Sequence, residues 1–365
     1  MKILHVGNLA NYAFFITRYL REKEINAELL LNKNKSASLN CLQYFNSNDY
    51  PNWIKTYDTT KKMWYLNILK IMRQDFDILH AYAELPIYAS FSGKKFIANV
   101  QGSDLRELAF SSSFKGRLLR RAYKKAKVII IPGIEGLPLL EKLNISNGIF
   151  IPAFIDLNHF SKHDAKSINN EKLTIFQPTF HDWNTKKNNN LIIGFKKFLK
   201  YQPNSKLKII KRGKDIQRSI NLIKKLELEN YVEYYNESLS TDKLIEAFES
   251  SDIIADQFLR GELGGIGREA LCAKKPLLTS CFKDRYEELL SSAPPVSHAI
   301  SAEEICEQLI FLSDKKNRII QAQKGYDWII KNYHPDKISN KFIRLYEEIN
   351  NKTKIKKIRE IIQYT

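Results

Sequence analysis

The chain has 365 residues, of which 44% are hydrophobic, so we expect about two globular domains and no extensive disorder. The formal net charge of +18 predicts an anionic partner, such as a phosphate-bearing substrate, a nucleic acid or an anionic membrane surface. No apolar run is long enough to span a bilayer, and the four cysteines lack the spacing of a zinc site or a disulfide framework, which indicates a reducing compartment.

The first half alternates short apolar runs with segments of helical period, a pattern typical of an α/β protein with a parallel sheet. The beginning of the chain is interpreted as a strand and not as a secretion signal, because Gly7, Asn8 and Asn11 interrupt its apolar run. Strands are predicted at residues 2–7, 27–32, 77–82, 95–100, 127–131 and 148–153. Helices are predicted at residues 14–24 and 63–74.

The second half repeats this alternation, which predicts a second doubly wound unit. Strands are predicted at residues 173–178, 206–211, 231–235, 252–258 and 276–280, with helices at 215–229 and 241–250. The polar stretch at residues 161–172 is expected to be the linker between the units. Beyond about residue 300 the pattern is helical, and residues 337–362 predict one long basic helix or two.

A glycine-rich stretch, "DQFLRGELGGIGREA" at residues 256–270, follows one of these strands. A helix is expected to begin near Gly265, so that the backbone N–H groups of Gly264 and Gly265 face an anion, while Gly267 serves helix packing. Glu269 lies about one turn into that helix, where it can accept hydrogen bonds from a hydroxylated ligand. A tight βα turn with a solvated Glu269 explains the turn by itself equally well.

The same stretch, with "REALCAKKPLL" at residues 268–278, resembles the donor motif of glycosyltransferase family 4, which comprises retaining enzymes of the GT-B fold. It is most similar to the branch with the pattern DQxxxGxxGxxxxEA. The resemblance implies that Glu269 holds the ribose of a nucleotide donor. The family's other motif glutamate, which contacts the donor sugar, falls on Gly261, and the neighbouring Glu262 is the candidate for that contact.

Residues 176–195 resemble the first loop of the C-terminal domain in this family, where an arginine and a lysine bind the donor diphosphate. Lys186 falls on the lysine, and His181 lies near the position of the arginine. Lys187 or Arg212 is expected to supply the positive charge that the arginine would have carried. An ordinary surface lysine is the alternative for Lys186.

Two further stretches resemble elements of the family. The loop after the first strand, which contains Gly7, corresponds to a loop near the donor phosphates and the acceptor. Residues 151–160 resemble the interdomain stretch and keep Pro152, Asp156 and Phe160. The resemblance as a whole covers residues 1 to about 335.

The N-terminal half also offers two polar residues for the cleft. Residues 99–107 resemble a cleft-facing element of the family, and Asp104 within them is the candidate for a polar group near the reacting carbon. An N-cap for the following helix is the alternative for Asp104. His80 ends a predicted strand, and it is interpreted either as a cleft residue or as a buried histidine with satisfied hydrogen bonds.

The resemblance implies a GT-B architecture of two Rossmann-like domains that face a cleft. The predicted domains are 1–158 on the acceptor side, 159–335 for the nucleotide sugar, and a helical segment at 336–365 that packs back on the first domain. The expected enzyme transfers a sugar from a UDP- or GDP-sugar to a saccharide or lipid-linked hydroxyl, without a metal or other cofactor, in surface polysaccharide, lipopolysaccharide or glycan assembly. Asp104 and Lys186 are the candidate catalytic residues.

Two other functions remain open from the sequence. A GT-B nucleotide-sugar 2-epimerase would share the fold and the nucleotide site without using an acceptor. A basic nucleic-acid-binding protein would explain the charge, but no helix-turn-helix, zinc-finger or RNP-type motif is evident, so no nucleic acid is expected as a partner.

The basic residues are concentrated in two segments. Residues 115–127 carry seven basic residues and no acid, and residues 352–359 add five more. The first segment has an apolar helical face, formed by Leu118, Leu119, Ala122, Tyr123 and Ala126, that is expected to pack on the sheet. Its basic face can lie on anionic lipid, so the expected location is cytoplasmic, with peripheral association to the inner face of the plasma membrane as one alternative.

Overall fold

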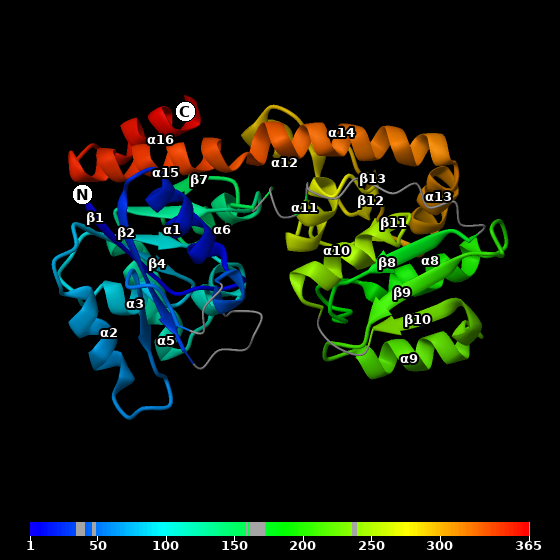
Figure 1. Cartoon of the computed structure of the whole chain (residues 1–365), viewed down its shortest axis with the longest axis horizontal. Coiled ribbons are helices and arrows are strands. Elements are labelled where there is room, and N and C mark those ends of the chain that lie inside the picture. The colour runs from blue at the N-terminus through cyan, green and yellow to red at the C-terminus, as the bar shows by residue number, and fades with distance from the viewer. Residues whose placement is uncertain are drawn as a thin grey trace. The chain divides into compact units, whose positions relative to one another are not determined.

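The computed structural model describes residues 1–33, 41–45, 49–155, 157, 160, 172–235 and 239–364. The chain divides into two compact units (Figure 1). Unit 1 comprises Met1–Ile155 and Tyr333–Thr365, and unit 2 comprises Asp156–Asn332. The predicted linker lies outside the described residues except for Lys172, and so does Asp156 of the interdomain stretch.

Unit 1 is built on a parallel sheet in the order β3-β2-β1-β4-β5-β6-β7 among the described residues. Its central strands are buried on both faces, which explains their near-continuous apolar sequences. The strands are β1 (Lys2–Val6), β2 (Asn26–Asn32), β3 (Ile54–Tyr57), β4 (Ile78–Tyr82), β5 (Phe96–Asn99), β6 (Val128–Ile131) and β7 (Gly148–Phe150). Strand β3 was not predicted, because it is a short edge strand whose two middle residues are not buried.

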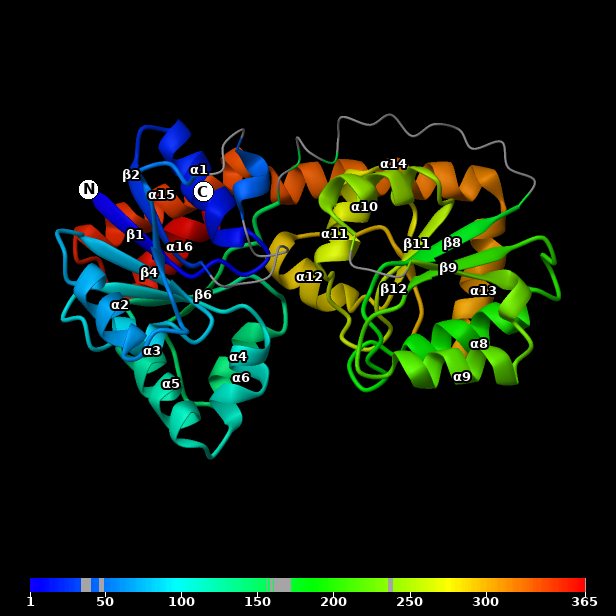
Figure 2. The same ribbon diagram turned by 60° about the horizontal axis from the view of Figure 1, so that its bottom comes forward.

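Helices cover both faces of this sheet. Helices α1, α15 and α16 contribute to one hydrophobic cluster, whereas α2, α3, α5 and α6 contribute to the cluster on the other face (Figures 1 and 2). The helices of unit 1 are α1 (Tyr12–Glu22), α2 (Trp64–Met72), α3 (Pro86–Ala89), α4 (Ser103–Arg106), α5 (Phe114–Lys125), α6 (Gly136–Lys142), α15 (Pro335–Asn350) and α16 (Ile355–Tyr364). The C-terminal segment therefore returns to the N-terminal unit as expected, as two helices.

Unit 2 has a parallel sheet in the order β10-β9-β8-β11-β12-β13 among the described residues. The strands are β8 (Thr174–Gln177), β9 (Lys206–Ile210), β10 (Val232–Tyr235), β11 (Ile253–Ala255), β12 (Leu277–Thr279) and β13 (Ser297–His298). The sequence pattern missed β13, since two residues are too few to show a period.

The helices of unit 2 also lie on both faces of their sheet. Helices α8, α9 and α13 pack on one face, and α10 lies on the other (Figure 2). The start of α13 follows from its sequence, because Ser301 and Glu304 form a capping box. The helices are α8 (Asn188–Phe198), α9 (Ile216–Lys225), α10 (Thr241–Glu249), α11 (Gly265–Cys272), α12 (Lys283–Leu290), α13 (Ala302–Ser313) and α14 (Lys315–Tyr333).

The apolar face predicted for residues 115–127 packs as expected. Leu119, Ala122 and Tyr123 of α5 are fully buried, and Leu119 and Tyr123 belong to the cluster beneath the sheet. Within the part of the chain that is described, no helix combines the length and the apolar character needed to cross a bilayer.

Candidate functional site

The strand order of unit 2 predicts where a ligand would bind. The chain runs from β8 outward to β9 and β10, and then returns to place β11 on the opposite side of β8. The loops that leave β8 and β11 therefore diverge, and in doubly wound sheets the resulting crevice at the carboxyl ends of the strands is the usual ligand site. Residues 178–187 and 256–264 form these two loops.

The glycine-rich loop begins helix α11 as predicted, but its two phosphate-site glycines differ in their surroundings. A Cβ atom on Gly264 would lie 2.7 Å from Oδ2 of Asp256, so a larger residue there would have to displace that carboxylate. A Cβ atom on Gly265 would meet nothing within 4 Å, and this residue is exposed. The amide of Gly265 therefore lies at an open helix N-terminus, where backbone N–H groups and the helix dipole favour an anion.

Gly261 has a left-handed backbone with φ of +66°, and an aromatic ring occupies the space beside it. A Cβ atom at this position would lie 2.2 Å from the ring of Phe282. Backbone hydrogen bonds hold the two segments together, since Phe282 N donates to Gly261 O over 2.8 Å and Gly261 N donates to Ser280 Oγ over 3.0 Å. The position that carries a glutamate in the resembling family thus has no room for one, and the sequence did not identify Phe282 as its neighbour.

Gln257 connects the two loops of the crevice. Its Oε1 accepts a hydrogen bond from Lys186 Nζ over 3.0 Å, and its Nε2 donates to the backbone oxygen of Glu262 over 2.8 Å. The amide of Phe258 also donates to Lys186 O over 3.1 Å. The structure therefore brings Lys186 to the glycine-rich loop, and the buried Gln257 is the residue that holds it there.

Asp256, the other residue of the "DQ" pair, is buried at the end of β11. Its Oδ1 accepts a hydrogen bond from Thr179 Oγ1 over 3.1 Å, but its Oδ2 has no partner among the described residues. The side-chain oxygen of Gln177 at the end of β8 is likewise buried without a partner among these residues. Buried polar atoms without partners are uncommon, so their presence at this edge of the sheet indicates a site that a ligand or water completes.

Glu269 lies on α11 and is partly buried. Burial raises the pKa of this carboxyl to about 7, with Asp256 adding to the effect and Arg268 opposing it. Its side chain forms no hydrogen bond with the described residues, so its oxygens are available to accept hydrogen bonds from a ligand.

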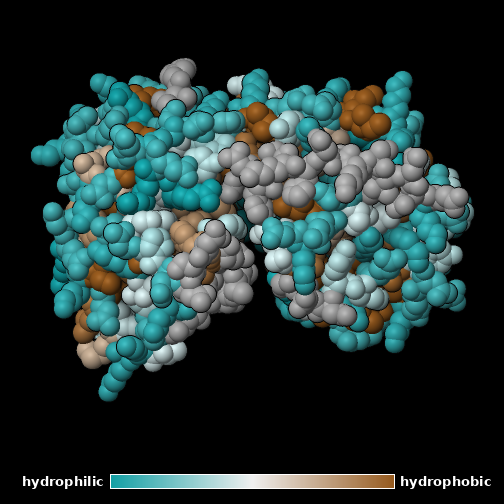
Figure 3. All heavy atoms as spheres, viewed as in Figure 1, coloured by the Kyte–Doolittle hydropathy of each residue, from teal (hydrophilic) through white to brown (hydrophobic). Residues whose placement is uncertain are grey.

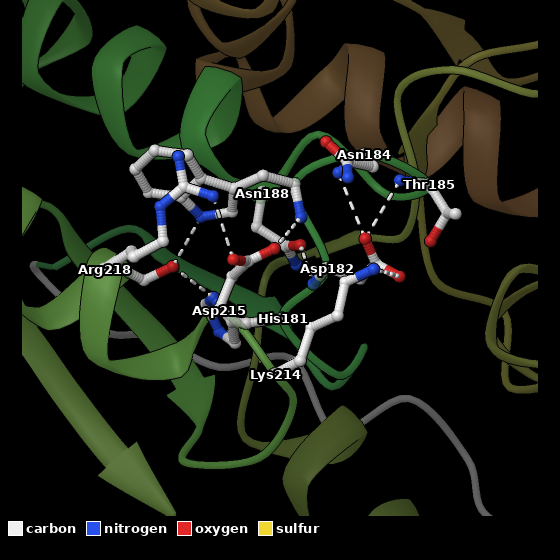
Figure 4. Close-up of polar contacts among 10 residues, drawn as sticks. His181, Asp182, Asn184, Thr185, Asn188, Lys214, Asp215 and Arg218 are labelled. Atoms are coloured by element: carbon white, nitrogen blue, oxygen red, sulfur yellow. Dashed lines mark hydrogen bonds and ion pairs between the residues drawn. The ribbon is translucent and has the colours of Figure 1, made fainter.

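The loop after β8 is held in a compact turn by Asp182 (Figure 4). Its Oδ1 accepts hydrogen bonds from the amides of Asn184 and Thr185, over 3.0 and 3.2 Å. Its Oδ2 pairs with Lys214 Nζ at 3.1 Å, and its own amide donates to Asn188 Oδ1 over 2.9 Å. These contacts fix the backbone on which Lys186 is carried.

His181 begins this turn and is fully buried. Its Nδ1 lies 2.8 Å from Ser219 Oγ, and its Nε2 has no partner among the described residues. Burial lowers the pKa of His181 to about 4, against the opposing effect of Asp215. The imidazole is therefore neutral at neutral pH, and positive charge for a diphosphate has to come from other residues.

Other basic residues lie after β9 and at the end of the β8 loop. Arg212 is exposed, and its backbone oxygen accepts a hydrogen bond from His181 N over 2.7 Å, which places it beside the β8 loop. Arg218 is already engaged, because it pairs with Asp215 at 2.9 Å and stacks on the ring of Trp183 at 4.3 Å (Figure 4). Lys187 precedes α8 with a left-handed φ of +55°.

The two predicted site residues of unit 1 occupy different settings. Gly7 directly follows β1 with φ of +101°, and a Cβ atom there would lie 2.7 Å from Leu85 Cδ1. Asp104 is buried, and its oxygens accept hydrogen bonds from Gln101 N at 3.0 Å and from Tyr123 OH at 2.9 Å. The N-cap alternative for Asp104 is wrong, because the helix that contains it is preceded by Gly102 as its cap.

His80 is a buried histidine with satisfied hydrogen bonds, the second of its two interpretations. Its Nδ1 lies 2.7 Å from Tyr346 OH, and its Nε2 lies 3.2 Å from Asn99 Oδ1. Burial lowers its pKa to about 3. Among the described residues, no group of three or more histidine, cysteine or acidic side chains is arranged to hold a metal ion.

Sequence comparisons find no match, either to a protein-family profile or to a curated protein. Solved structures do match. Anabaena HepE in complex with UDP and glucose has a TM-score of 0.76 at 12% identity, with 95% of this chain and all of that chain covered. WaaG, a glycosyltransferase involved in lipopolysaccharide biosynthesis, has a TM-score of 0.66 at 14% identity, with 93% and 98% covered.

A putative UDP-N-acetylglucosamine 2-epimerase from Listeria monocytogenes also matches, with a TM-score of 0.64 at 11% identity and 97% and 98% of the two chains covered. At sequence identities this low, the structural similarity establishes the fold and not the activity. The chain has two α/β units, each built on a parallel sheet, and its structure matches these proteins over almost the whole length of both chains. This protein therefore has the GT-B fold.

Proposed function

We propose that this protein is a retaining glycosyltransferase that moves a sugar from a nucleotide diphosphate sugar to a hydroxyl group of a saccharide or lipid-linked acceptor. The observation that carries the proposal is the arrangement at the carboxyl ends of β8 and β11. There, Lys186 of the β8 loop is bound to the loop that leads into α11, and α11 carries the exposed Gly265 at its N-terminus and Glu269 one turn further on. These groups match the diphosphate and the ribose of a nucleotide.

Each group has a defined part in the proposed reaction. Glu269 accepts hydrogen bonds from the ribose hydroxyls, and the N-terminus of α11 and Lys186 bind the diphosphate. Negative charge grows on the departing diphosphate as the bond to the sugar breaks, and fixed positive groups stabilise that charge. The reaction then needs no protein nucleophile, and this diphosphate site uses protein groups in place of a divalent metal.

The resemblance to glycosyltransferase family 4 and the UDP and UDP-glucose bound to HepE support a UDP-sugar as donor, with a GDP-sugar as the other option. Because Phe282 fills the space beside Gly261, we assign the contact with the donor sugar to Glu262. Arg212 and His181 complete the donor site in this proposal, with His181 contributing as a neutral group. Gly7 keeps its assignment to the donor phosphates, and Asp104 keeps its assignment as a catalytic polar group near the reacting carbon.

A thermal-shift screen with UDP-, GDP-, CMP- and dTDP-sugars tests the donor class. A nucleotide sugar present at 100 times its dissociation constant is expected to stabilise unit 2 by about 2.7 kcal/mol. The absence of a shift with all four classes contradicts the assignment of the donor site.

Glu269→Gln is the sharpest single-residue test. A hydrogen bond to a charged group contributes about 1.5 to 3 kcal/mol, so affinity for UDP should fall by roughly 10- to 100-fold while the fold is retained. Glu287→Gln on the exposed surface of α12 is the matched control and should leave affinity unchanged. Equal affinity of wild type and Glu269→Gln removes Glu269 from the site.

Glu262→Gln distinguishes binding of the donor sugar from binding of the nucleotide. It should weaken binding of the nucleotide sugar and leave binding of the free nucleotide diphosphate unchanged, because only the sugar is assigned to Glu262. Calorimetric titration of wild type and variant with both ligands measures the difference. A loss that is equal for the two ligands contradicts a contact with the sugar.

The match to a putative UDP-N-acetylglucosamine 2-epimerase favours one second candidate, an epimerase that uses the same nucleotide site. Product analysis with a labelled nucleotide sugar distinguishes the two. The transferase forms labelled glycoside only when an acceptor is added, whereas the epimerase converts the nucleotide sugar to its 2-epimer without one.

A lipid-linked acceptor would place the protein on the inner face of the plasma membrane, in polysaccharide or lipopolysaccharide assembly. Helix α5 supports this placement. Of its basic residues, Lys115 pairs with Glu84 at 2.8 Å and Arg120 donates to two backbone oxygens of unit 1. Arg117, Arg121 and Lys124 are exposed, so they can contact anionic lipid. Binding to liposomes that is independent of anionic lipid content contradicts this placement.

A further inference from the structure

Unit 1 has a cavity of about 380 Å³ between the edge strand β3 and helix α2, outside the proposed donor site in unit 2. Four residues of or just beyond α2 face it at helical spacing, Asn67, Lys70, Ile71 and Gln74. The residues that line it are Lys33, Thr56, Tyr57, Asp58, Lys61, Asn67, Lys70, Ile71 and Gln74.

The cavity carries a surplus of positive charge. Three lysines and one acid line it, and the acid is already engaged within the loop. Asp58 accepts hydrogen bonds from the amide and the hydroxyl of Thr60, over 2.9 and 2.7 Å, and pairs with Lys33 Nζ at 3.4 Å. The hydrogen bonds from Thr60, helped by Lys33, lower the pKa of Asp58 to about 2.

The other two lysines of the cavity differ from Lys33. Neither Lys61 nor Lys70 forms an ion pair with any residue in the described part of the chain. Polar groups stand beside them, because Thr56 and Asn67 also line the cavity. Gln74 uses its oxygen to accept from Lys55 Nζ at 3.1 Å, which leaves its NH₂ group as a donor. The lining therefore combines cationic and neutral donors with little competing negative charge.

The side of α2 next to these residues is apolar and exposed. Leu66, one turn before Lys70, is 45% exposed, and Met63, about two turns before it, is 48% exposed. Hydrophobic surface is visible over α2 in Figure 3. An apolar surface beside a lysine-lined cavity suits the junction between a phosphate headgroup and a lipid chain, whereas the cavity by itself suits the phosphate of a soluble compound.

We propose that the cavity between β3 and α2 is a second anion site, which binds a phosphate monoester or diester through Lys61 and Lys70. Lysine ammonium groups bind phosphate as point charges, and amide and hydroxyl donors add direction. The phosphate belongs either to a lipid headgroup or to a soluble phosphorylated compound. The site is independent of the proposed donor site.

A probe confined to the lysines tests the site. Reductive ¹³C-methylation keeps the charge of each lysine and makes it visible by NMR, and Lys61→Gln and Lys70→Gln assign the two resonances. Titration with inorganic phosphate should shift both resonances saturably, with sodium chloride at equal ionic strength as the reference. Lys224 and Lys225, exposed on α9 of unit 2, are the matched control and should respond to ionic strength alone.

Identical responses of all four lysines to phosphate and to chloride overturn the proposal, since they show only diffuse screening. The same titration on Glu269→Gln should be unchanged. Loss of nucleotide binding and loss of this site are therefore separate results.

Vesicles distinguish the two sources of phosphate. Cosedimentation with phosphatidylglycerol and phosphatidylcholine vesicles is compared with pure phosphatidylcholine. If the phosphate is a headgroup, Met63→Ser/Leu66→Ser binds the anionic vesicles more weakly than wild type does and keeps the saturable phosphate shifts. If it is soluble, the shifts occur and Met63→Ser/Leu66→Ser binds the anionic vesicles to the same extent as wild type. Vesicle binding that is unaffected by Lys61→Gln/Lys70→Gln, without phosphate shifts, overturns the proposal.

Discussion

The buried polar cluster beneath α15 in unit 1 and the buried polar groups at the ends of β8 and β11 in unit 2 differ in how their atoms are partnered. In unit 1, both nitrogens of His5 and both of His80 have partners, supplied mainly by Tyr82 and Tyr346. In unit 2, single atoms of Gln177, His181 and Asp256 have none among the described residues.

This difference distinguishes a structural group from a candidate binding group. A satisfied buried network stabilises one arrangement of the chain, and here it attaches helix α15 to strands β1 and β4. An unsatisfied buried group costs about 1 to 3 kcal/mol, so a site that keeps several of them at one sheet edge is arranged for something other than stability. The predictions below test this division.

Acidification should produce the largest difference in stability between the two units. Burial lowers the pKa values of His5 and His80, so the folded unit 1 binds fewer protons below pH 6.5 than the unfolded chain does. The stabilisation they contribute is complete above pH 6.5 and is lost as pH falls, by about 2 kcal/mol at pH 5 for His80, with His5 adding a loss in the same direction.

Hydrogen exchange of the β1 and β4 amides, compared with those of β8 and β9, measures each unit separately. Among the described residues of unit 2, one buried histidine, His181, has a lowered pKa, so this unit should lose less stability than unit 1 does. His334→Gln, at an exposed position outside the buried cluster, is the control and should leave the difference between the two units in place. Equal losses of stability in the two units would show that the buried histidine and tyrosine cluster of unit 1 does not determine the pH dependence.

Tyr346→Phe should destabilise unit 1 by about 1 to 3 kcal/mol, because it leaves His80 Nδ1 buried without its partner. Affinity for UDP should not change, since the residue lies outside the proposed donor site. Urea denaturation and nucleotide titration measure the two effects, with Tyr201→Phe at an exposed position as the control. A loss of nucleotide affinity without a loss of stability contradicts a purely structural role for Tyr346.

Gln257→Glu should weaken binding of a diphosphate by about tenfold, because the new carboxylate pairs with Lys186 and neutralises it. Affinity for uridine, which has no phosphate, should be unchanged. Calorimetry with UDP and uridine measures the difference, and Gln217→Glu on the exposed face of α9 is the control for added negative charge. If both ligands lose affinity equally, Gln257 supports the whole loop and does not position Lys186 for phosphate.

The smallest effect concerns the ionisation of Glu269. With a pKa of about 7 in the free protein, its ionised fraction rises with pH, and the ionised form is the better acceptor for ribose hydroxyls. Affinity for uridine should therefore increase by roughly fourfold between pH 6.5 and 8, a figure that follows from the ionised fractions. Glu269→Gln should abolish this dependence, and a dependence that persists in the variant assigns it to another group.

Local patterns were sufficient for most of the elements. Apolar runs predicted the strands from β1 to β12 except β3, because buried parallel strands are nearly continuous in Val, Ile and Leu. The glycine-rich stretch predicted the start of α11, whereas the strand before it ends at Ala255 and not at Phe258 as predicted. Strands β3 and β13 were missed because each is too short to show a period at the edge of its sheet.

The sequence by itself determined the α/β class, the repeated doubly wound pattern and the loop at which a nucleotide is proposed to bind, because these depend on neighbouring residues. Only the tertiary structure decided what surrounds each site residue. Phe282 lies against Gly261, and Gln257 reaches Lys186 across 71 positions of the chain. Asp104 is buried against Tyr123, and His181 is neutral. Such contacts, and the burial that shifts a pKa, arise only when distant segments pack together.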